Sequence, residues 1–553
     1  MLNIGIVQNQ VAASYIFDVK TDNAGTSNND QFTLPLDSAG TYNFVIDWGD
    51  GSAKETITTW NQAETTHTFS GGAGTYTINI WGTIILWYFA SGGDKDKIVD
   101  ISRWGTLQVG TTQGRYFQDC TNLTISSTDV MKTNLVTDMN LMFSGCTSLV
   151  DIPNIRFWDT SGVTNMTGVF RDCDLFNADL SEWDVGNVTD FTNFCIRARD
   201  FTSDLSAWDT SSMTRSVNMF NNANDFDSDC SAWDVSSLTD ATNMFSGSNL
   251  SNDNYNLLLE GWSAQSLQSS VPFHGGNGQW YFGYGGQSKY DIISGYSWTI
   301  TDNGQNDSSL GLWLNAHNLL KTSANPPGGT LRNNWLDLSD NANDASATSG
   351  QRPRFNTGVL NGEPGVLFDG DNDRLNISPD ASINDIFDSG GSVFVVLNAT
   401  TEGEDIGRVF SKYSNDGDTN GCVLYLNDDS AGFASAILQQ GFSTTNGIWS
   451  VTDAVEYGSP TIILITYDNS STSNDPVFYV NSKTPSTVTE GTTPVGSFKS
   501  DTTRDLTIGN SEGTNRTFDG YIFELGVWKK VLSTSEISDY FDYFSNKYGV
   551  TLT

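Results

Sequence analysis

Aspartates that recur at a fixed interval are the residues of this chain best suited to cation chemistry. Each lies directly after a Trp, and a Ser or Gly follows two residues later. The four residues are Asp159, Asp184, Asp209 and Asp234. Each carboxylate could cap a turn by accepting hydrogen bonds from backbone N–H groups two or three residues on. The alternative is a ladder of Ca²⁺ sites, and the small residue after each Asp favours the turn.

A second acidic segment, "DGDND" at Asp369–Asp373, has the alternating carboxylates of a calcium site. An EF-hand loop needs Gly at its sixth position, where this chain has Arg374. We therefore expect a structural turn. Calcium bound by Asp369, Asp371 and Asp373 is the alternative, and calcium is the one cofactor that the sequence suggests.

Other residue types repeat in the same register, and this predicts stacked structural repeats. A period of 20–50 residues is typical of a solenoid, in which each repeat forms one coil. The Trp column is Trp158, Trp183, Trp208 and Trp233, and the Phe column is Phe143, Phe170, Phe220 and Phe245, with Cys195 in the Phe position of one repeat. Apolar residues such as Met166, Val169 and Phe170 have the spacing of a short helical arc. We expect Asn193, Asn218 and Asn243 to stack their amides in a hydrogen-bonded ladder.

The cysteines of the repeats occupy positions that are apolar or small in other repeats. They are Cys120, Cys146, Cys173, Cys195 and Cys230. A free Cys behaves as a small buried hydrophobe, so we expect reduced thiols in the core. A disulfide between Cys120 and Cys146 is the alternative.

Composition limits the classes of partner. The chain has 553 residues, a formal net charge of -38 and a sequence pI of about 4.1, so a phosphate backbone would be repelled and nucleic-acid binding is not expected. Aromatic residues make up 12%, which is typical of a folded chain. No run of 18 apolar residues occurs, and we expect no membrane insertion. The opening "MLNIGIVQNQVAAS" lacks a basic segment, so we do not expect it to be a secretory signal.

The phrases "WDTSGVTNMTGVF", "WDVGNVTDFTNFC", "WDTSSMTRSVNMF" and "WDVSSLTDATNMF" resemble the BspA-like surface-repeat family, a branch of the leucine-rich repeats. The resemblance implies a solenoid over residues 91–252. It also implies a cap over residues 253–307, in which Leu257, Leu258, Leu259 and Trp262 form the apolar face of a helix.

The flanking segments resemble two further families. "GTYNFVIDWGDGS", "THTF" and "GTYTINIWG" resemble a PKD-type immunoglobulin-like sandwich over residues 13–90, in which His67 has a structural role. "GVLFDGDNDRLNI", "SVFVVLNAT" and "FDGYIFELGVWKKVL" resemble a concanavalin A-like or laminin-G-like jelly roll over residues 308–553. Ser533 and Glu536 have the spacing of a capping box for a last helix. The predicted fold class is therefore mostly β and multidomain.

The chain lacks the motifs that the most familiar hydrolases of such folds use. Glycoside hydrolysis needs two carboxyl groups about 5 to 9.5 Å apart, which sandwich hydrolases often carry as E-x-D-x-E on one strand. That pattern and HExxH are absent, and His67, His274 and His317 lie in three different modules. We predict that the protein is not an enzyme.

Recognition folds without an export signal suggest a protein that is displayed on a phage particle. We predict a fibre or decoration subunit on the virion surface, attached to other virion proteins through residues 1–12, that binds a host-surface glycan or protein. We expect a homo-oligomer. The alternatives are a bacterial cell-surface adhesin and a tail protein that degrades polysaccharide.

Overall fold

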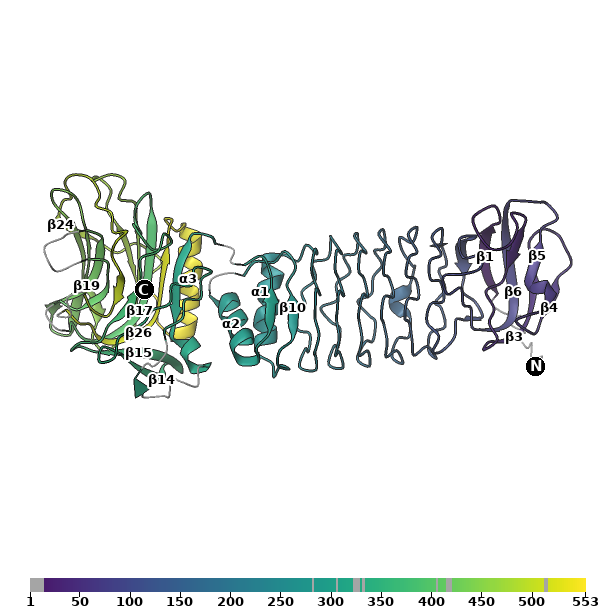
Figure 1. Cartoon of the computed structure of the whole chain (residues 1–553), viewed down its shortest axis with the longest axis horizontal. Coiled ribbons are helices and arrows are strands. Elements are labelled where there is room, and N and C mark those ends of the chain that lie inside the picture. Colours follow the sequence, from purple (N-terminus) through teal and green to yellow (C-terminus); the bar gives the residue numbers. More distant parts are fainter. Residues whose placement is uncertain are drawn as a thin grey trace, which may run out of the picture. The chain divides into compact units, whose positions relative to one another are not determined.

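The computed structural model describes residues 14–280, 283–304, 307–321, 329–330, 334–403, 406–413, 420–511 and 516–553. The chain divides into two compact units: unit 1 comprises residues 1–281 and 291–304, and unit 2 comprises residues 282–290 and 305–553. Strands hold more residues than helices in both units, which confirms the predicted mostly β, multidomain class (Figure 1). The predicted attachment segment, residues 1–12, lies outside the described residues, and the four boundaries between the five predicted segments stay predictions.

Unit 1 begins with a larger sheet in the order β4–β3–β6–β1–β7–β9, with β8 paired to β6, and a small sheet of β2 and β5. The strands are β1 Tyr15–Lys20, β2 Gln31–Thr33, β3 Thr41–Asp47, β4 Glu55–Ile57, β5 Thr66–Thr68, β6 Thr75–Ile85, β7 Ile98–Arg103, β8 Leu107–Gln108 and β9 Thr124–Ile125, and a 3-10 helix, η1, spans Ala63–Thr65. Tyr42, Phe44 and Ile46 of β3 are buried and alternate with exposed residues, so one face of this strand packs on the core. Phe17 of β1 packs on Phe32 of β2 with ring centroids 6.0 Å apart, so the two sheets face each other.

The larger sheet runs without interruption into the repeats. Strand β7 pairs antiparallel with β1 on one side and parallel with β9 on the other. Because β9 belongs to the first coils of the repeat region, the first module and the repeats share one hydrogen-bonded sheet.

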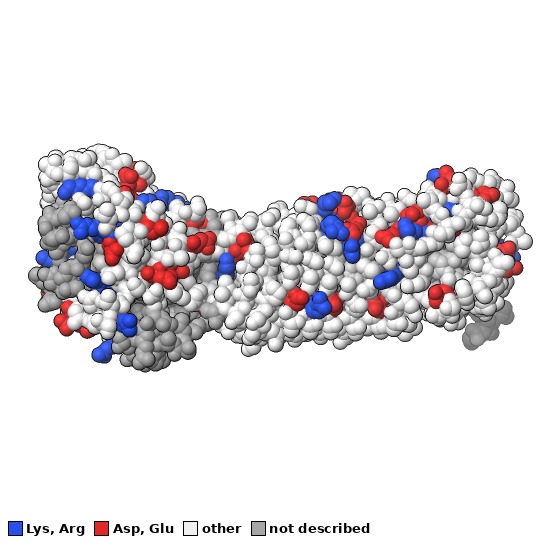
Figure 2. Space-filling view, in the orientation of Figure 1, with Lys and Arg blue, Asp and Glu red and all other residues white. Residues whose placement is uncertain are grey.

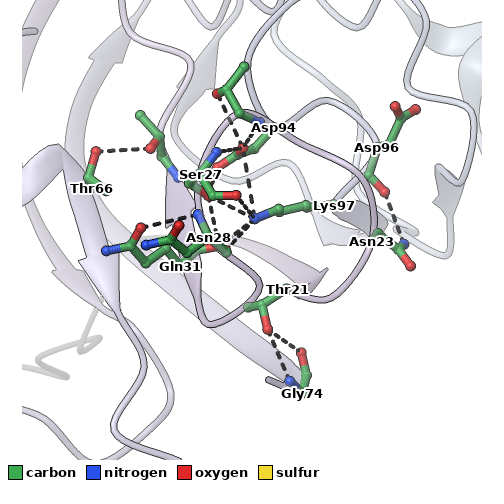
Figure 3. A network of polar contacts seen from close by, with 12 residues as sticks. Thr21, Asn23, Ser27, Asn28, Gln31, Thr66, Gly74, Asp94, Asp96 and Lys97 are labelled. Atoms are coloured by element: carbon green, nitrogen blue, oxygen red, sulfur yellow. Dashed lines mark hydrogen bonds and ion pairs between the residues drawn. The ribbon is translucent and has the colours of Figure 1, made fainter. Parts of the chain in front are cut away.

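A buried ion pair fastens the loop after β1 to the start of β7 (Figure 3). The Lys97 ammonium donates to the backbone carbonyls of Ser27 (3.2 Å), Asn28 (2.8 Å) and Gln31 (2.9 Å). Asp94 accepts from the backbone N–H of Ser27 (3.0 Å) and from its hydroxyl (2.6 Å). The Lys97 and Asp94 side chains are both fully buried, and the ammonium occupies a cage of carbonyl oxygens of the kind that could hold a small cation.

The repeats form coils that are stacked through parallel backbone contacts (Figure 1). Isolated parallel bridges join Asp138 to Asn165, Asn165 to Asp190, Asp190 to Arg215, and Arg215 to Asp240. A Thr recurs at equivalent positions of successive coils. The backbone N–H of each such Thr donates to the Thr carbonyl one coil earlier, as in Thr239 to Thr214 at 2.9 Å. A short 3-10 helix, η2, spans Ile155–Phe157.

The predicted helical arc is wrong, because its residues form turns instead. One residue in each arc has a left-handed backbone: Leu141, Gly168, Asn193, Asn218 and Asn243 have φ between 52° and 64°. A left-handed residue breaks an α-helix, and Asn and Gly adopt that conformation more readily than other types. The recurring Asn is therefore explained first by the left-handed backbone conformation that it allows. The expected amide ladder is confirmed for one pair, in which Asn218 Nδ2 donates to Asn193 Oδ1 at 3.0 Å.

Helix α1, Asn252–Ser263, follows the last 25-residue coil and begins after an N-cap at Ser251. Leu258, Leu259 and Trp262 are buried, as the sequence predicted. Leu257 does not belong to the buried face, since 44% of it is exposed. It lies on the opposite side of the helix because adjacent helical residues differ by about 100°.

Further rungs follow α1. Strands β10 Pro272–His274 and β11 Thr299–Thr301 pair in parallel, and Phe273 of β10 bridges in parallel to Ala241 of the last coil. Helix α2, Tyr284–Tyr296, lies between these two strands in the sequence. The stack of parallel backbone contacts therefore continues through β10 and β11.

Unit 2 consists of two large sheets that enclose one apolar core. The eight-stranded sheet has the order β13–β14–β15–β26–β17–β22–β23, with β12 paired to β26, and the seven-stranded sheet has the order β16–β25–β18–β19–β20–β21–β24. The strands are β12 Leu310–Asn315, β13 Gly329–Thr330, β14 Arg354–Leu360, β15 Glu363–Asp369, β16 Leu375–Ile377, β17 Gly391–Thr401, β18 Arg408–Ser411, β19 Cys422–Ser430, β20 Phe433–Gln440, β21 Gly447–Glu456, β22 Thr461–Tyr467, β23 Val477–Val480, β24 Thr489–Thr492, β25 Leu506–Ile508 and β26 Asp519–Trp528, and a 3-10 helix, η3, spans Ala316–Lys321.

The last helix, α3, spans Thr534–Tyr548 and packs beside β26. It begins with the predicted capping box, in which the Ser533 hydroxyl accepts from the backbone N–H of Glu536 and the Glu536 carboxylate accepts from the backbone N–H of Ser533. The fully buried Glu524 carboxylate of β26 accepts from the hydroxyl of Tyr548 at 2.7 Å and pairs with Lys547 at 3.2 Å. These contacts fix the helix to the eight-stranded sheet.

Candidate functional site

The outer face of the seven-stranded sheet of unit 2 gathers aromatic and hydrogen-bonding side chains in register. Cross-strand pairing places Arg408 of β18 opposite Tyr425 of β19, and Tyr425 opposite Ile437 of β20. In the next row, Val423 of β19 pairs with Gln439 of β20. The alternate residues Leu424, Leu426, Ala436 and Leu438 belong to the core. Because successive side chains of a strand point to opposite faces, the first set lies on the face away from the core.

Tyr413, just after β18, is held on this face by contacts from several directions. Its phenol oxygen accepts from Gln439 Nε2 (2.8 Å) and from Asn446 Nδ2 (3.3 Å). The Arg408 guanidinium lies 5.5 Å from the centroid of the Tyr413 ring and donates to the Tyr413 carbonyl at 3.2 Å. We call Arg408, Tyr413, Tyr425, Gln439 and Asn446 the tyrosine face.

The tyrosine face combines one cation with neutral polar groups. Burial, together with the nearby charge of Arg516, lowers the pKa of Arg408 to about 10. Arg408 therefore stays charged at neutral pH. Burial raises the pKa of the Tyr425 phenol, which stays protonated. Phenols, amides and a guanidinium offer hydrogen bonds in both directions and flat rings for stacking, which is the chemistry of a site for a polyhydroxylated ligand.

Sequence reasoning missed this face. The alternation in β19 and β20 predicts strands, but Tyr413 and Asn446 lie outside strands, and no motif joins them to Tyr425. Only the register of β18, β19 and β20 brings these side chains together. An excess of Tyr, Gln and Asn on the outward positions of adjacent strands was the one available signal.

The predicted calcium residues form a tight acidic turn after β15. Asp369 Oδ1 accepts from the backbone N–H of Asp371 (3.1 Å) and Asn372 (3.4 Å), and Asp373 Oδ2 accepts from the backbone N–H of Asp369 (3.1 Å). Burial raises the pKa of Asp373 to about 6, and the charge of Asp369 contributes. Within the described parts of the chain, no group of three or more His, Cys, Asp or Glu side chains is arranged to hold a metal ion. Calcium binding at this turn stays the untested alternative to the structural turn.

The aspartates of the repeats cap turns, as the first alternative predicted. Each accepts from the backbone N–H two residues on: Asp159 from Ser161 (3.2 Å), Asp184 from Gly186 (3.2 Å), Asp209 from Ser211 (3.0 Å) and Asp234 from Ser236 (2.9 Å). A hydrogen bond from the Ser211 hydroxyl and one from its backbone N–H lower the pKa of Asp209. The carboxylates are thus compensated by local donors.

The Trp and Phe columns form the core of the stack. All four Trp and all four Phe residues are buried. Each indole in the later coils donates to a carbonyl one coil earlier: Trp183 to Ile155 (2.9 Å), Trp208 to Leu180 (3.0 Å) and Trp233 to Leu205 (2.9 Å). Trp262 of α1 continues the series by donating to Cys230 at 3.0 Å. These residues are structural in the arrangement that the chain adopts.

The Phe stack shows how the chain tolerates Cys195. Phe143 and Phe170 stack with centroids 5.9 Å apart, and Phe220 and Phe245 stack at 5.7 Å. Where Cys195 interrupts the column, the ring of Phe194 stands edge-on to Phe170 at 5.8 Å and to Phe220 at 6.5 Å. A ring from the adjacent position therefore occupies the space that Cys195 leaves.

The cysteines of the repeats are buried and free, and so is Cys422 of unit 2. Burial raises the pKa of each thiol, so these thiols are protonated at neutral pH. Cys146 and Cys173 donate from sulfur to the carbonyls of Phe117 (3.2 Å) and Phe143 (3.0 Å). This agrees with the predicted core role.

The three histidines have separate surroundings. His67 stacks on Trp48 with centroids 4.7 Å apart, and its Nε2 lies 3.1 Å from Asp50 Oδ2. His274 Nδ1 accepts from the backbone N–H of Gly276 at 3.1 Å, and His317 Nδ1 lies 2.8 Å from Glu363. The contacts of His67 fit the structural role that its motif implied.

One catalytic pattern escaped the sequence reasoning. Residues 509–513 read G-x-S-x-G. The nucleophile elbow of hydrolases needs this pattern at an exposed turn between a strand and a helix. Ser511 follows β25, but it is fully buried, and its carbonyl accepts from Arg374 at 3.2 Å. Ser511 therefore does not have the exposure that a nucleophile requires.

Two family models match parts of this chain. Residues 89–152 and 137–258 match the family described as "Mycoplasma protein of unknown function, DUF285", which supports the BspA-like repeat resemblance. Residues 369–538 match the concanavalin A-like lectin/glucanases superfamily. The C-terminal unit has a concanavalin A-like fold. Comparison with curated protein sequences gave no significant match.

Solved structures align with parts of the chain. The binding domain of Paraclostridial Mosquitocidal Protein 1 aligns with 14% identity and a TM-score of 0.31, over 43% of this chain and 53% of that chain. Domain 4 of an extracellular arabinanase from Geobacillus stearothermophilus, in complex with arabinotriose, aligns with 13% identity and a TM-score of 0.29, over 42% of this chain and 98% of that chain. The Ruminococcus gnavus sialidase module bound to sialyllactose aligns with 16% identity and a TM-score of 0.22, over 27% of this chain and 82% of that chain. We draw no functional conclusion from these alignments.

Charged side chains on the visible surface are mixed. Figure 2 shows Lys and Arg beside Asp and Glu in small groups on a face that consists mainly of other residues. On the repeats, Arg197 pairs with Asp172, and Arg199 pairs with Asp174 at 2.5 Å. Among the helices that the structure describes, none has both the length and the apolar composition that crossing a bilayer requires.

Proposed function

We propose that this chain is a non-enzymatic recognition protein that binds glycans through the tyrosine face of its concanavalin A-like unit. The observation that carries the proposal is the placement of Tyr413, whose hydroxyl accepts from Gln439 and Asn446 beside Arg408 and Tyr425. The superfamily that residues 369–538 match includes lectins, which is consistent with this role.

The expected contacts follow from the chemistry of sugars. The apolar face of a pyranose ring packs on an aromatic side chain, and its hydroxyls exchange hydrogen bonds with amides and guanidinium groups. Tyr413 and Tyr425 supply the rings, while Gln439, Asn446 and Arg408 supply the donors and acceptors. Sites of this kind lie on rigid elements with loops around them, and the three central strands β18, β19 and β20 provide that rigidity.

A glycan array probed with the full chain tests the proposal. The array should return binders, and Tyr425→Ala should reduce their affinity by about tenfold or more, because one stacked aromatic contributes about 1 to 3 kcal/mol. Trp60→Ala is the matched control: Trp60 is 47% exposed in unit 1 and should not affect binding. Equal losses from both variants, or retention of binding by Tyr425→Ala, would contradict the assignment.

The non-enzymatic part of the proposal has its own test. The named groups of the tyrosine face are phenols, amides and a guanidinium, whereas glycoside hydrolysis uses two carboxyl groups. Incubation with capsular or algal polysaccharides should release no reducing ends. Release above that of a heat-denatured control would favour the polysaccharide-degrading alternative.

We also propose that the chain is displayed on a surface where such binding is useful, on a virion or on a cell. The repeat region and the concanavalin A-like unit are both of kinds used for recognition. Detection of the chain in purified phage particles by mass spectrometry is expected for the virion subunit. Its recovery only from the bacterial cell envelope would support the adhesin alternative instead.

A further inference from the structure

Three polar residues that do not belong to the tyrosine face meet in unit 2. Lys412 follows β18, Asn384 lies between β16 and β17, and Asp501 precedes β25. Lys412 Nζ lies 2.7 Å from Asn384 Oδ1 and 3.3 Å from Asp501 Oδ1. The side chains of Lys412 and Asp501 are 0% and 2% exposed. The Lys412 amine therefore contacts both a carboxamide and a carboxyl group. The amine and the carboxyl group have almost no access to bulk water, and Asn384 is half-buried.

Neighbouring groups fix the positions of the amide and the acid. Asp385 N–H donates to Asp501 Oδ1 (2.8 Å), and Asp501 N–H donates to Asp385 Oδ1 (2.7 Å). The Lys529 ammonium donates to the backbone carbonyls of Asn384 and Asp385. Ile383 and Ile386, on either side of this pair in the sequence, belong to the apolar core. Since both partners are held by the backbone, the Lys412 amine meets the Asn384 side chain in a fixed geometry.

We propose that Lys412 and Asn384 join in an intramolecular isopeptide bond, with Asp501 as the acid–base group. A buried carboxyl beside the amine can accept its protons and return them to the leaving nitrogen. Burial raises the pKa of Asp501, which suits it to hold a proton between these steps. Fixed contact of the reacting groups supplies much of the rate that a free amine and amide lack.

The step balances without an added reagent. Asp501 takes a proton from the Lys412 ammonium, and the lone pair of the resulting amine forms a bond to Cγ of Asn384. Asp501 passes this proton and a second one from Nζ to Nδ2 of Asn384. The bond between Cγ and Nδ2 breaks, and the nitrogen leaves as ammonium. Lys412 and Asn384 are then joined by a secondary amide, and Asp501 is again a carboxylate.

Other charged groups that face this cluster do not obstruct the step. Asp385 and Asp501 balance Lys412 and Lys529, and Asp380 lies near enough for the charge of Lys412 to lower its pKa. The Cys422 thiol is buried nearby and protonated. In the sequence, Asn384 precedes β17 of the eight-stranded sheet, and Lys412 directly follows β18 of the seven-stranded sheet. The bond would therefore tie the two sheets together.

Mass spectrometry of the full chain tests the proposal directly. The intact protein should be about 17 Da lighter than its sequence, which is the mass of one ammonia molecule. Fragmentation of a digest should yield one branched peptide that joins Lys412 to Asn384. Localisation matters because the Asn-Gly pairs at 277–278, 303–304, 361–362, 420–421 and 446–447 can also lose ammonia by cyclising. A chain at its full sequence mass, or a loss that maps only to those pairs, would overturn the proposal.

Variants separate the bond from an ordinary buried ion pair. Lys412→Arg keeps the charge but removes the amine, and Asn384→Ala removes the amide, so both should restore the full sequence mass of the variant. Asp501→Asn should leave most molecules unjoined. Lys483→Arg is the matched control, since it changes a lysine of unit 2 that pairs with Asp542 at the surface, and it should retain the lower mass. If the variants fail to fold, the branched peptide of the native chain still decides the question. A branched peptide in Lys412→Arg digests would contradict the assignment of Lys412.

Discussion

Substitutions of single residues in the repeats should differ in how much they lower the free energy of unfolding. Phe220 is fully buried, with its ring 3.9 Å from Phe226 and 5.7 Å from Phe245. Phe220→Ala should lower the free energy of unfolding by about 3 to 5 kcal/mol, because it leaves a cavity between stacked rings. Phe157 is 49% exposed, and Phe157→Ala should change stability by less than about 0.5 kcal/mol. Denaturant titration of both variants checks this, and equal effects would contradict the packing described.

Asp373 should make stability depend on pH. Its pKa is about 6 in the folded chain, above its ordinary value of 3.8, so the folded state binds the proton more tightly than the unfolded state. The free energy of unfolding should therefore fall as pH rises from about 4 to about 6, by about 1 to 2 kcal/mol after solvent screening, and then level off. Asp373→Asn should remove this part of the pH profile. A profile that is unchanged in the variant would show that Asp373 titrates normally.

The same residue gives the calcium prediction a test. A bound cation would relieve the repulsion between Asp369 and Asp373 and would stabilise the folded chain by mass action. If the predicted site exists, Ca²⁺ at neutral pH should raise the melting temperature of the native chain and leave that of Asp373→Asn unchanged. An equal response of both proteins would show that the turn does not bind calcium.

Thiol reactivity reports on the repeat core as well. The thiolate is the reactive form, and burial both raises the pKa of these thiols and blocks access to them. A thiol reagent should label Cys120, Cys146, Cys173, Cys195 and Cys230 in the native chain only as slowly as the core opens. Rapid labelling of all five in native buffer would contradict their burial, and labelling in denaturant confirms that each is reduced.

At the scale of elements, one of the side chains that join helix α1 to the coils makes the same hydrogen bond as the Trp of a repeat. Trp262 donates its indole N–H to the Cys230 carbonyl, as the Trp of each later coil does to the coil before it. Trp262→Phe keeps a ring but removes one of the two hydrogen bonds to the Cys230 carbonyl, which also accepts from the backbone N–H of Trp233 at 3.2 Å. It should therefore cost about 0.5 to 1.5 kcal/mol beyond the change in packing. The readout is the midpoint of denaturant unfolding.

Trp158 provides the matched comparison. It is buried in the same column, but its indole nitrogen has no hydrogen-bond partner. Trp158→Phe removes an unsatisfied donor and should therefore cost less than Trp262→Phe. If the two variants lost equal stability, the hydrogen bond between α1 and the last coil would have no net value.

At the scale of the molecule, unit 1 should unfold as one body. Strand β7 carries the sheet of the first module into the repeats, and Lys97 fastens the loop after β1 to the start of that strand. Lys97→Met should lower stability by about 3 to 5 kcal/mol, because it leaves the buried Asp94 carboxylate without its cation. Hydrogen exchange should show amides of the first module and of the coils losing protection together.

Lys20 serves as the control for Lys97. It forms an exposed ion pair with Asp22, in which both side chains are 44% exposed. Lys20→Met should change stability by less than about 1 kcal/mol, since exposed ion pairs contribute little. Loss of protection in the first module alone, in the Lys97→Met chain, would show that the shared sheet does not couple the two regions.

The sequence by itself determined the repeats, the strand-rich class and the turn caps, because these depend on neighbours in the chain. A 25-residue period places Trp208 over Trp183 in any stacked arrangement, and an Asp followed two residues later by Ser or Gly suits a turn wherever it lies. The concanavalin A-like unit was visible from its strand patterns and final capping box for the same reason. The helical arc failed because the spacing of apolar residues does not report the left-handed residue at Asn193 and its equivalents.

Only the tertiary structure decided which distant side chains meet. The tyrosine face depends on the register of three strands, and a shift of one residue would turn Tyr425 into the core. Lys412, Asn384 and Asp501 come from three segments separated by up to 117 positions in the numbering, and Lys97 reaches carbonyls of a loop about 70 residues earlier. Such contacts arise from the closure of sheets and loops around a shared core. No local pattern encodes them, because their free energy comes from burial that exists only in the folded chain.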